Sequence, residues 1–309
     1  MIDTAYSEFI STKRITAAPC GIMEPPELSS KLFAHQRDLV NWALRRGRAA
    51  LFADTGLGKG WMILEWARVV AAHTGPRPVL ILAPLAVSRQ FESEARLLGQ
   101  AVSVCESTDD LKPGVNVTNY QKLHRFDPAA LGGVALDESS ILKSLDGKTR
   151  SRLIEAFGRL PFKLCATATP SPNDHTELGG HAEFLGVMSQ SEMLSTFFSH
   201  DGGSTQDWRL KGHARAEFWR WVCSWGAIVK MPSDIGGDDS GYVLPALRYH
   251  DHVIPGSRES ALKSGMLFAA PAMTLNEERA ARRGTIAERV YRAAGIVNAD
   301  AAAGGAEYG

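Results

Sequence analysis

Between residues 49 and 166, short apolar runs alternate with longer amphipathic stretches. The runs cover residues 49–53, 78–83, 115–118, 133–136 and 162–166, and helical patterns cover 60–72, 86–98 and 149–158. Runs of a few residues that are apolar on both faces suit parallel strands covered on both sides by helices. The alternation predicts a doubly wound α/β domain with a parallel sheet, in which ligands bind at the carboxyl ends of the strands.

The segments around this domain follow other patterns. Residues 1–28 are an N-terminal extension that ends in a stiff stretch at 24–27, which we expect to stay outside the core. An amphipathic helix begins near Leu32 and ends near Gly47, and the α/β lobe is assigned to 29–185. Residues 186–243 are predicted to be a helical and aromatic insertion. Residues 244–309 are a linker with a candidate strand at 244–253, a charged helix after Thr274 and a disordered tail.

The composition is that of an ordinary globular protein. Of 309 residues, 44% are hydrophobic, and Lys+Arg equals Asp+Glu, so nucleic-acid binding would need a local basic face. The four cysteines lack the spacing of zinc ligands and indicate buried free thiols in a reducing compartment. No run approaches the roughly 18 apolar residues of a membrane span. Residues 1–12 do not form a signal peptide, so we expect a cytoplasmic protein that does not contact membranes.

A glycine-rich segment follows the first apolar run and opens a helix, as a phosphate loop does. Its glycines would let backbone N–H groups close around phosphate oxygens, and Lys59 would contact the β and γ phosphates of ATP. Gly60 stands where Ser or Thr normally supplies a hydroxyl to Mg²⁺. The simpler alternative is a glycine-rich turn with an incidental lysine. The nucleotide-binding residues assigned here are Asp54, Thr55, Gly56, Leu57, Gly58, Lys59 and Gly60.

Two carboxylates end the run at 133–136. Asp137 would hold Mg²⁺, directly or through water, and Glu138 would polarise the attacking water. The alternative is a helix-capping aspartate beside a solvated glutamate. Hydroxyls at Thr167 and Thr169 could hydrogen-bond this pair and relay the nucleotide state, although a plain Thr/Pro turn is the better explanation of this segment taken alone. Gln36 could match the adenine edge, or it could be a surface glutamine.

Taken in order, these segments resemble the first RecA-like lobe of a superfamily-two DEAD-like helicase or translocase of the Swi/Snf-like branch, and most of all the bacteriophage type. The resemblance covers about 30–185 and continues loosely to Val253. It rests on Gln36, on 53–60 as motif I, on 82–87 as motif Ia, on 118–120, on 136–140 as the Walker B box and on 168–173 as motif III.

The resemblance implies an ATPase that moves along or remodels duplex DNA, with ATP and Mg²⁺ as cofactors. Lys59, Asp137 and Glu138 would serve phosphate, Mg²⁺ and the attacking water. Thr167 and Thr169 would couple the two sides of the lobe. No later strand-helix series follows, so we expect a missing second lobe, supplied in cis or by a downstream segment. Turnover by this chain alone should be weak, and a phage-encoded chain would work in the host cytoplasm. The residues implied to lie against DNA are Pro84, Leu85, Thr118 and Asn119.

Two other functions compete with this one. A non-catalytic module could use a helicase-like lobe to hold DNA or a partner, and an ATPase could act on something other than nucleic acid. An aromatic series at helical spacing, Phe218, Trp221, Val222 and Trp225, predicts a buried stripe, although nearby arginines would also suit a DNA surface. His175 and His181 are predicted to be surface or capping residues.

Overall fold

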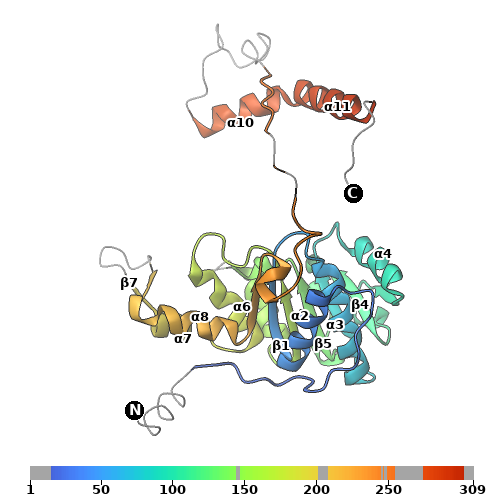
Figure 1. Ribbon diagram of the computed structural model, residues 1–309, viewed down its shortest axis with the longest axis vertical. Coiled ribbons are helices and arrows are strands. Elements are labelled where there is room, and N and C mark those ends of the chain that lie inside the picture. The colour runs from blue at the N-terminus through green and yellow to red at the C-terminus, as the bar shows by residue number, and fades with distance from the viewer. Residues whose placement is uncertain are drawn as a thin grey trace. The chain divides into compact units, whose positions relative to one another are not determined.

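The computed structural model describes residues 15–143, 147–200, 208–244, 246, 249–254 and 274–302. These residues belong to two units, Met1–Val243 and Leu244–Gly309, and each unit is described by itself. Figure 1 shows the strands and most helices in the first unit, with α10 and α11 in the second.

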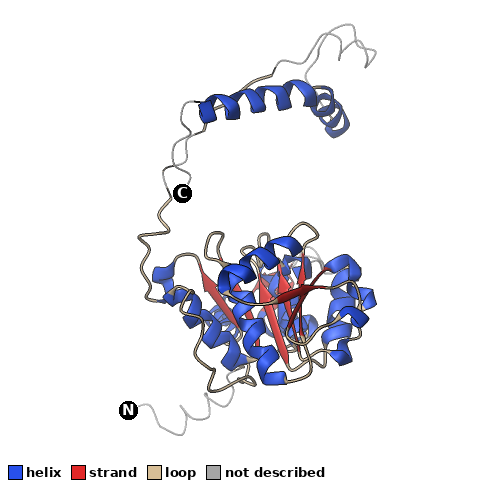
Figure 2. Ribbon diagram, turned by 90° about the vertical axis from the view of Figure 1, so that its right-hand side faces the viewer, coloured by secondary structure: helices blue, strands red, loops and turns tan. Residues whose placement is uncertain are grey.

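The centre of the first unit is a parallel sheet. Among the described residues it has seven strands in the order β3-β4-β2-β5-β6-β1-β9, and every neighbouring pair runs parallel. Figure 2 shows helices on both sides of these strands. The predicted α/β fold is confirmed. The strands are β1 (Arg48–Ala53), β2 (Val79–Ala83), β3 (Val102–Val104), β4 (Val115–Asn119), β5 (Gly133–Asp137), β6 (Phe162–Ala166) and β9 (Gly226–Val229).

Two apolar layers cover the sheet because alternate residues of each strand point to opposite faces. On one face Leu51 and Ile81 pack with α2 and α3, and on the other Phe52 and Leu82 pack with α6 and α8. The helices of this unit are α2 (Ala34–Arg46), α3 (Lys59–Thr74), α4 (Ser88–Leu98), α5 (Lys148–Phe157), α6 (Leu178–Leu185), α7 (Gln190–Phe197) and α8 (Arg215–Cys223).

The region 186–243, predicted to be helical, also contains strands, which corrects that prediction. β9 pairs with β1, and β7 (Phe198–His200) pairs antiparallel with β8 (Trp208–Leu210). Three or four residues are too few to show a period of two, so only pairing with a partner makes them strands. The aromatic stripe is confirmed as buried, since Phe218, Trp221, Val222 and Trp225 are each 0% exposed.

The N-terminal extension contributes to the core on both sides of its stiff stretch. Ile22 and Leu28 are buried in the layer that contains α2 and α3. Backbone N–H groups of residues 20–22 donate to the carbonyls of residues 44–46 at the end of α2. None of the residues of the stiff stretch 24–27 is buried, so that stretch stays outside the core as expected, whereas Ile22 and Leu28 on either side of it do not. The expectation of buried thiols also holds only in part, because Cys105 and Cys165 are buried whereas Cys20 and Cys223 are exposed.

The second unit contains α10 (Leu275–Gly284) and α11 (Ile286–Ala302). Thr274 caps α10 by accepting a hydrogen bond from the backbone N–H of Glu277, so the predicted charged helix is present. The described residues between 244 and 254 have no regular structure, which corrects the candidate strand there. Most of the predicted disordered tail lies outside the described residues. None of the helices in the described ranges is long and apolar enough to span a bilayer.

Candidate nucleotide-binding site

The sheet topology brings the sequence motifs to one edge. Since all the strands are parallel, their carboxyl ends meet at the same edge. From β4 through β2, β5, β6 and β1, that edge carries in turn Asn119, Pro84, Asp137, Thr167 and Asp54. Motifs separated by up to about a hundred residues in the chain thus become neighbours on adjoining strands.

The phosphate loop leaves β1 and ends at the first residue of α3. Gly56 and Gly58 have φ values of 86° and 75°, which favour glycine. Lys59 Nζ donates to the carbonyl oxygens of Ala53 at 2.9 Å and Asp54 at 3.0 Å, so its ammonium lies over the loop. Burial lowers the pKa of Lys59, while Glu138, Asp137 and Asp54 oppose that shift. The lysine is therefore within electrostatic reach of both predicted catalytic acids.

Gln36 is buried beside this loop. Its Nε2 donates to the carbonyl of Leu57 at 3.1 Å, and its Oε1 accepts from the N–H of Phe33 at 3.0 Å. A Cβ on Gly58 would lie 2.3 Å from Gln36 Nε2, so this glycine is needed for space as well as for its φ. Gln36 thus ties the start of α2 to the phosphate loop. The neighbouring Phe33 ring is 62% exposed and stacks on His35, whose ring also meets Tyr242 edge-on.

The two acids at the end of β5 have different surroundings. Burial and the adjacent Glu138 raise the pKa of Asp137 to about 6, Lys59 opposes the shift, and Glu94 adds to it. Glu138 has a φ of 52° and is the single non-glycine residue with positive φ in the described ranges. Backbone outliers of this kind concentrate at active sites. The turn directs Glu138 away from the course of its strand.

Hydroxyl groups hold the Glu138 carboxylate in place. Thr167 Oγ1 donates to Glu138 Oε1 at 2.9 Å, and Ser140 Oγ donates to the same oxygen. The backbone N–H of Thr169 donates to Thr167 Oγ1 at 3.1 Å, so motif III meets the acid through one hydroxyl. This is the kind of contact that the sequence suggested, and its coupling role remains a prediction.

The site fits a magnesium ion bound together with a nucleotide. Within the described ranges, no three His, Cys, Asp or Glu side chains are close enough to hold a metal alone. Mg²⁺ usually takes one or two carboxylates and completes its shell with phosphate oxygens and water. Asp137 offers one such carboxylate. Glu94 of α4, which the sequence analysis missed, approaches the place of the absent hydroxyl, because a Cβ on Gly60 would lie 2.1 Å from Glu94 Oε2.

The residues predicted to face DNA divide into two pairs. Leu85 is 67% exposed beside the half-buried Pro84, whereas Thr118 and Asn119 are only 1% and 4% exposed. Of these four residues, Pro84 and Leu85 are therefore the two that offer surface to a partner. Tyr120 serves the lobe itself, because its hydroxyl donates to the backbone carbonyl of Asp137 at 2.7 Å.

His181 lies in the interior, which corrects its prediction as a surface or capping residue. It is 0% exposed on α6, and its Nε2 lies 3.2 Å from Ser139 Oγ, directly after Asp137 and Glu138. Burial lowers the pKa of His181 to about 4. His175, in contrast, is exposed, as predicted. The sequence around a single histidine does not indicate whether that histidine is buried. Only the packing of α6 on the sheet shows that His181 supports the turn that follows β5.

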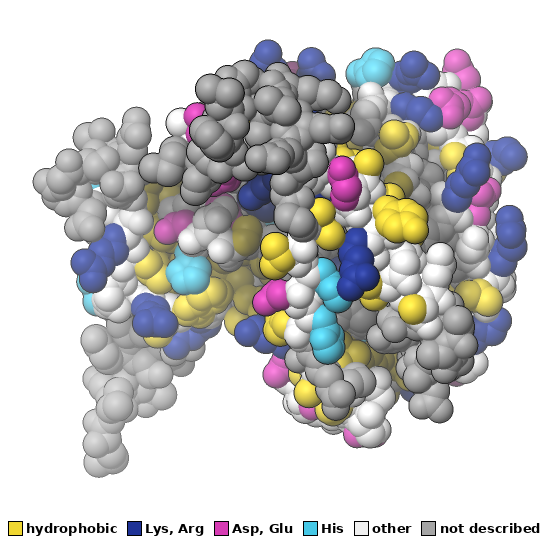
Figure 3. Space-filling view, turned by 90° about the horizontal axis from the view of Figure 1, so that it is seen from above, with side chains coloured by type: hydrophobic (Ala, Val, Ile, Leu, Met, Phe, Trp, Pro, Cys, Tyr) yellow, Lys and Arg dark blue, Asp and Glu magenta, His cyan; other side chains and the backbone are white. Residues whose placement is uncertain are grey.

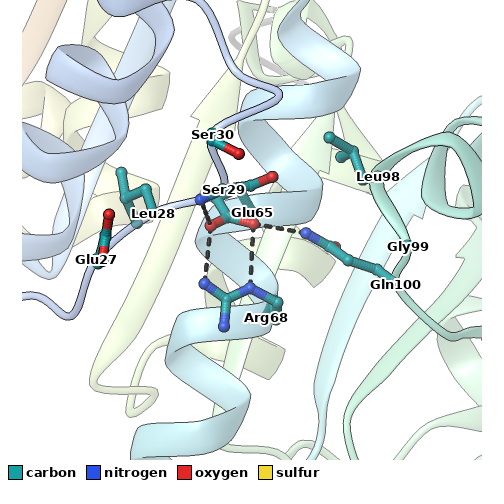
Figure 4. Close-up of a pocket in the computed structure, with 9 residues that line it drawn as sticks. All are labelled: Glu27, Leu28, Ser29, Ser30, Glu65, Arg68, Leu98, Gly99 and Gln100. Atoms are coloured by element: carbon teal, nitrogen blue, oxygen red, sulfur yellow. Dashed lines mark hydrogen bonds and ion pairs between the residues drawn. The ribbon is translucent and has the colours of Figure 1, made fainter.

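A pocket of about 380 Å³ lies away from the motifs, between the N-terminal segment, α3 and the end of α4. Figure 4 shows Ser29, Arg68 and Gln100 converging on the carboxylate of Glu65. Burial opposes ionisation of Glu65, but the hydrogen bonds from Arg68, Ser29 and Gln100 prevail and lower its pKa. Donors from the protein fill the acceptor positions of this carboxylate, so we interpret the pocket as a structural feature of the lobe and not as a ligand site.

No protein-family model matches this chain, and no curated protein matches it. Among solved structures, the Sulfolobus solfataricus SWI2/SNF2 ATPase core in complex with dsDNA is 20% identical, with a TM-score of 0.53 over 66% of this chain and 46% of that one. The Sulfolobus solfataricus SWI2/SNF2 ATPase core domain is 18% identical, with a TM-score of 0.51 over 69% and 48%. The UvsW helicase from bacteriophage T4 is 18% identical over 60% and 65%, at a TM-score of 0.42.

The first unit has the α/β RecA-like fold found in helicase cores. This chain spans slightly less than half the length of the two Sulfolobus structures. At such identities the likeness concerns the fold, and the function has to be argued from the residues of the site.

Proposed function

We propose that this chain is the ATP-binding lobe of a DNA-dependent ATPase of the superfamily-two helicase and translocase type. The observation that carries the proposal is the position of Lys59. It begins α3 after a loop with two positive-φ glycines, and it is within electrostatic reach of Asp137 and Glu138 on another strand. A glycine-rich turn with an incidental lysine has no reason to face a pair of acids across the sheet edge.

Each group of the site has a distinct part in the proposed reaction. The N–H groups of the loop and Lys59 Nζ would hold the β and γ phosphates. Mg²⁺, held by Asp137, would supply neutralising charge to the phosphate oxygens. Glu138 would orient the water that attacks the γ phosphorus and take its proton. The bond between the γ phosphorus and the bridging oxygen would break, so that ADP leaves with that oxygen and the other γ oxygens remain in inorganic phosphate. Thr167, which donates to Glu138, would report this change to motif III.

Adenine would lie beside Gln36 and Phe33. The exposed Phe33 ring offers a flat apolar surface, and the Gln36 amide holds the loop that would meet the phosphates. One N–H of the amide already donates to Leu57, so recognition of adenine would use the other N–H or follow a small shift of the side chain.

Duplex DNA is the proposed partner of the same edge, at Pro84 and Leu85. The proposal is supported by the exposed Leu85 and by the dsDNA complex of the Sulfolobus core, which shares the fold. Figure 3 shows Lys and Arg side chains interspersed with Asp and Glu on the face drawn. DNA binding would therefore depend on local contacts with the backbone and should weaken as salt increases.

Nucleotide binding tests the proposal. A fluorescent ATP analogue with Mg²⁺ should bind the wild type, and Lys59→Ala should weaken binding at least about tenfold, as expected for loss of a charge-assisted contact. Lys211→Ala is the matched control, since Lys211 Nζ also donates to two backbone carbonyls, at 2.9 and 3.0 Å, but far from the motifs in sequence. Equal affinity of Lys59→Ala and wild type would refute the site.

A non-catalytic, DNA- or partner-binding module is the second candidate, and Gly60 is the observation that favours it. Without a hydroxyl at this position, a common ligand of Mg²⁺ is lost. Steady-state hydrolysis with and without duplex DNA separates the two functions. Turnover stimulated by duplex DNA supports the motor. Nucleotide-sensitive DNA binding without turnover supports the module, and turnover that ignores DNA indicates an ATPase with another substrate.

A further inference from the structure

Gly60 and Glu94 fit each other as a pair. Gly60 is the second residue of α3, and its φ is not positive, so the backbone there does not require glycine. Glycine within a helix costs about 1 kcal/mol relative to alanine. A Cβ at this position would lie 2.1 Å from Glu94 Oε2 and 3.1 Å from its Cδ, so another residue fits here only if the Glu94 side chain moves away.

One oxygen of the Glu94 carboxylate is held by a hydrogen bond from Gln90, which lies one turn earlier on α4. Gln90 Nε2 donates to Glu94 Oε1 at 2.7 Å, and the other oxygen, Oε2, is the one nearest to Gly60. Because Gln90 is neutral, this contact orients the carboxylate without compensating its charge. Glu94 also lies near enough to Asp137 to act on it electrostatically. An oriented anionic oxygen thus occupies the place where a phosphate loop normally presents its hydroxyl.

We propose that Glu94 replaces the missing Ser/Thr hydroxyl of the phosphate loop as a ligand of the nucleotide-bound Mg²⁺, directly or through one water. The inference rests on the proposed nucleotide site. Asp137 and Glu94 would then contribute two carboxylates, which is within the usual number for a magnesium ion that shares its shell with phosphate oxygens. The change from hydroxyl to carboxylate adds one negative charge beside the β and γ phosphates.

That extra charge has a measurable consequence. Without a divalent cation, the carboxylates of Glu94, Asp137 and Glu138 would repel the phosphates, with Lys59 as their opposing charge in the loop. Nucleotide binding to the wild type should therefore depend strongly on Mg²⁺. Replacing Glu94 by its neutral isostere should raise the Mg²⁺ concentration that nucleotide binding requires. The affinity for nucleotide without metal should stay unchanged or become tighter.

The test is a titration of a fluorescent ADP or ATP analogue at several Mg²⁺ concentrations, repeated with Mn²⁺ observed directly by EPR. Glu94→Gln should need about tenfold more Mg²⁺ or Mn²⁺ for half-maximal binding, within the range seen when support of a metal site is lost. Glu92→Gln is the matched control, because it removes the same charge from the same helix two residues away, where side chains do not share a face.

An exchange of the pair separates a ligand from a mere neighbour. Gly60→Ser alone should weaken metal-dependent binding, because its Cβ would meet Glu94. The double variant Gly60→Ser, Glu94→Ala restores a hydroxyl in an emptied space and should return the metal requirement to within about threefold of wild type. Thermal melting confirms that each variant is folded.

Two results would overturn the inference. One is an unchanged metal requirement in Glu94→Gln, and a Thr55→Val variant that then raises the requirement would assign the ligand to Thr55 instead. The other is tighter nucleotide binding by equal factors with and without metal, which would mean that Glu94 only repels phosphate. No nucleotide binding by any protein in the series would remove the proposed function and the inference together.

Discussion

Glu65 on helix α3 and Glu94 on the neighbouring helix α4 have opposite surroundings. Glu65, on the helix itself, is 0% exposed, and its oxygens accept hydrogen bonds from Ser29, Arg68 and Gln100 (Figure 4). Glu94 reaches the first turn of α3 from α4, with one oxygen held by Gln90 and the other beside Gly60. The first carboxylate joins three segments of the chain, and the second faces a space left by a missing side chain.

The difference shows how to separate structural from functional acids in this fold. A buried carboxylate is stable only when its acceptor positions are filled, so a saturated one has no capacity left for a ligand. A carboxylate that is oriented on one side and open on the other keeps both its charge and its acceptor capacity. Mutations should therefore affect folding at Glu65 and binding at Glu94.

The largest effect is expected at Glu65. Glu65→Ala should lower the free energy of unfolding by about 3 kcal/mol, because it leaves Arg68 and two neutral donors without their shared acceptor. Urea denaturation measures this change. Nucleotide affinity of the folded protein should stay within about twofold of wild type. A loss below about 1 kcal/mol would show that the Glu65 carboxylate does not hold these three segments together.

His181, next to the turn that follows β5, is a second buried titratable residue with a structural role. The pKa of His181 is about 4 in the folded protein, below its ordinary 6.5. The unfolded chain therefore takes up the proton first, and stability is lost as pH falls from about 6.5 toward 4. Between pH 7 and 5 the loss from this group is about 2 kcal/mol.

Denaturant unfolding at pH 7 and pH 5 tests this contribution against His181→Gln, which lacks the titrating group. The wild type should lose about 2 kcal/mol more than the variant over that interval. His175→Gln, at an exposed histidine, should keep the pH dependence of the wild type. Parallel curves for wild type and His181→Gln would contradict the burial of a neutral imidazole.

The two glycines of the phosphate loop sharpen the comparison on the functional side. Both have positive φ, so alanine should cost about 1 kcal/mol at either one. Gly58→Ala should cost about 1 kcal/mol more, because its Cβ would displace the Gln36 amide, whereas nothing lies within 4 Å of a Cβ at Gly56. Thermal unfolding of the two variants provides the measurement, and equal destabilisation would deny Gln36 its role in holding the loop.

The smallest effect on stability is expected at Glu94. Glu94→Ala should change the free energy of unfolding by less than about 0.5 kcal/mol, because the residue is half-buried and its partner Gln90 is solvent-exposed. The same denaturation experiment as for Glu65→Ala measures it. A large loss here would assign Glu94 to the structure and remove the contrast between the two acids.

The sequence by itself determined the features that depend on local pattern. The apolar runs at 49–53 and 133–136 became central strands because full burial on both faces leaves a continuous hydrophobic signature. The sequence also placed the predicted phosphate loop and the acid pair at the ends of strands, where the structure has them. The spacing of Phe218, Trp221 and Trp225 likewise predicted a buried stripe, which α8 and the residue just beyond its cap provide.

Tertiary structure decided what depends on partners far along the chain. β9 is a strand only because it pairs with β1, and Ile22 is buried only because it packs against α2. Glu65 and Glu94 have the same side chain on neighbouring helices, and no local pattern distinguishes them. Their surroundings differ because one meets donors from three segments and the other lies beside a glycine, and such contacts form only when the chain has folded.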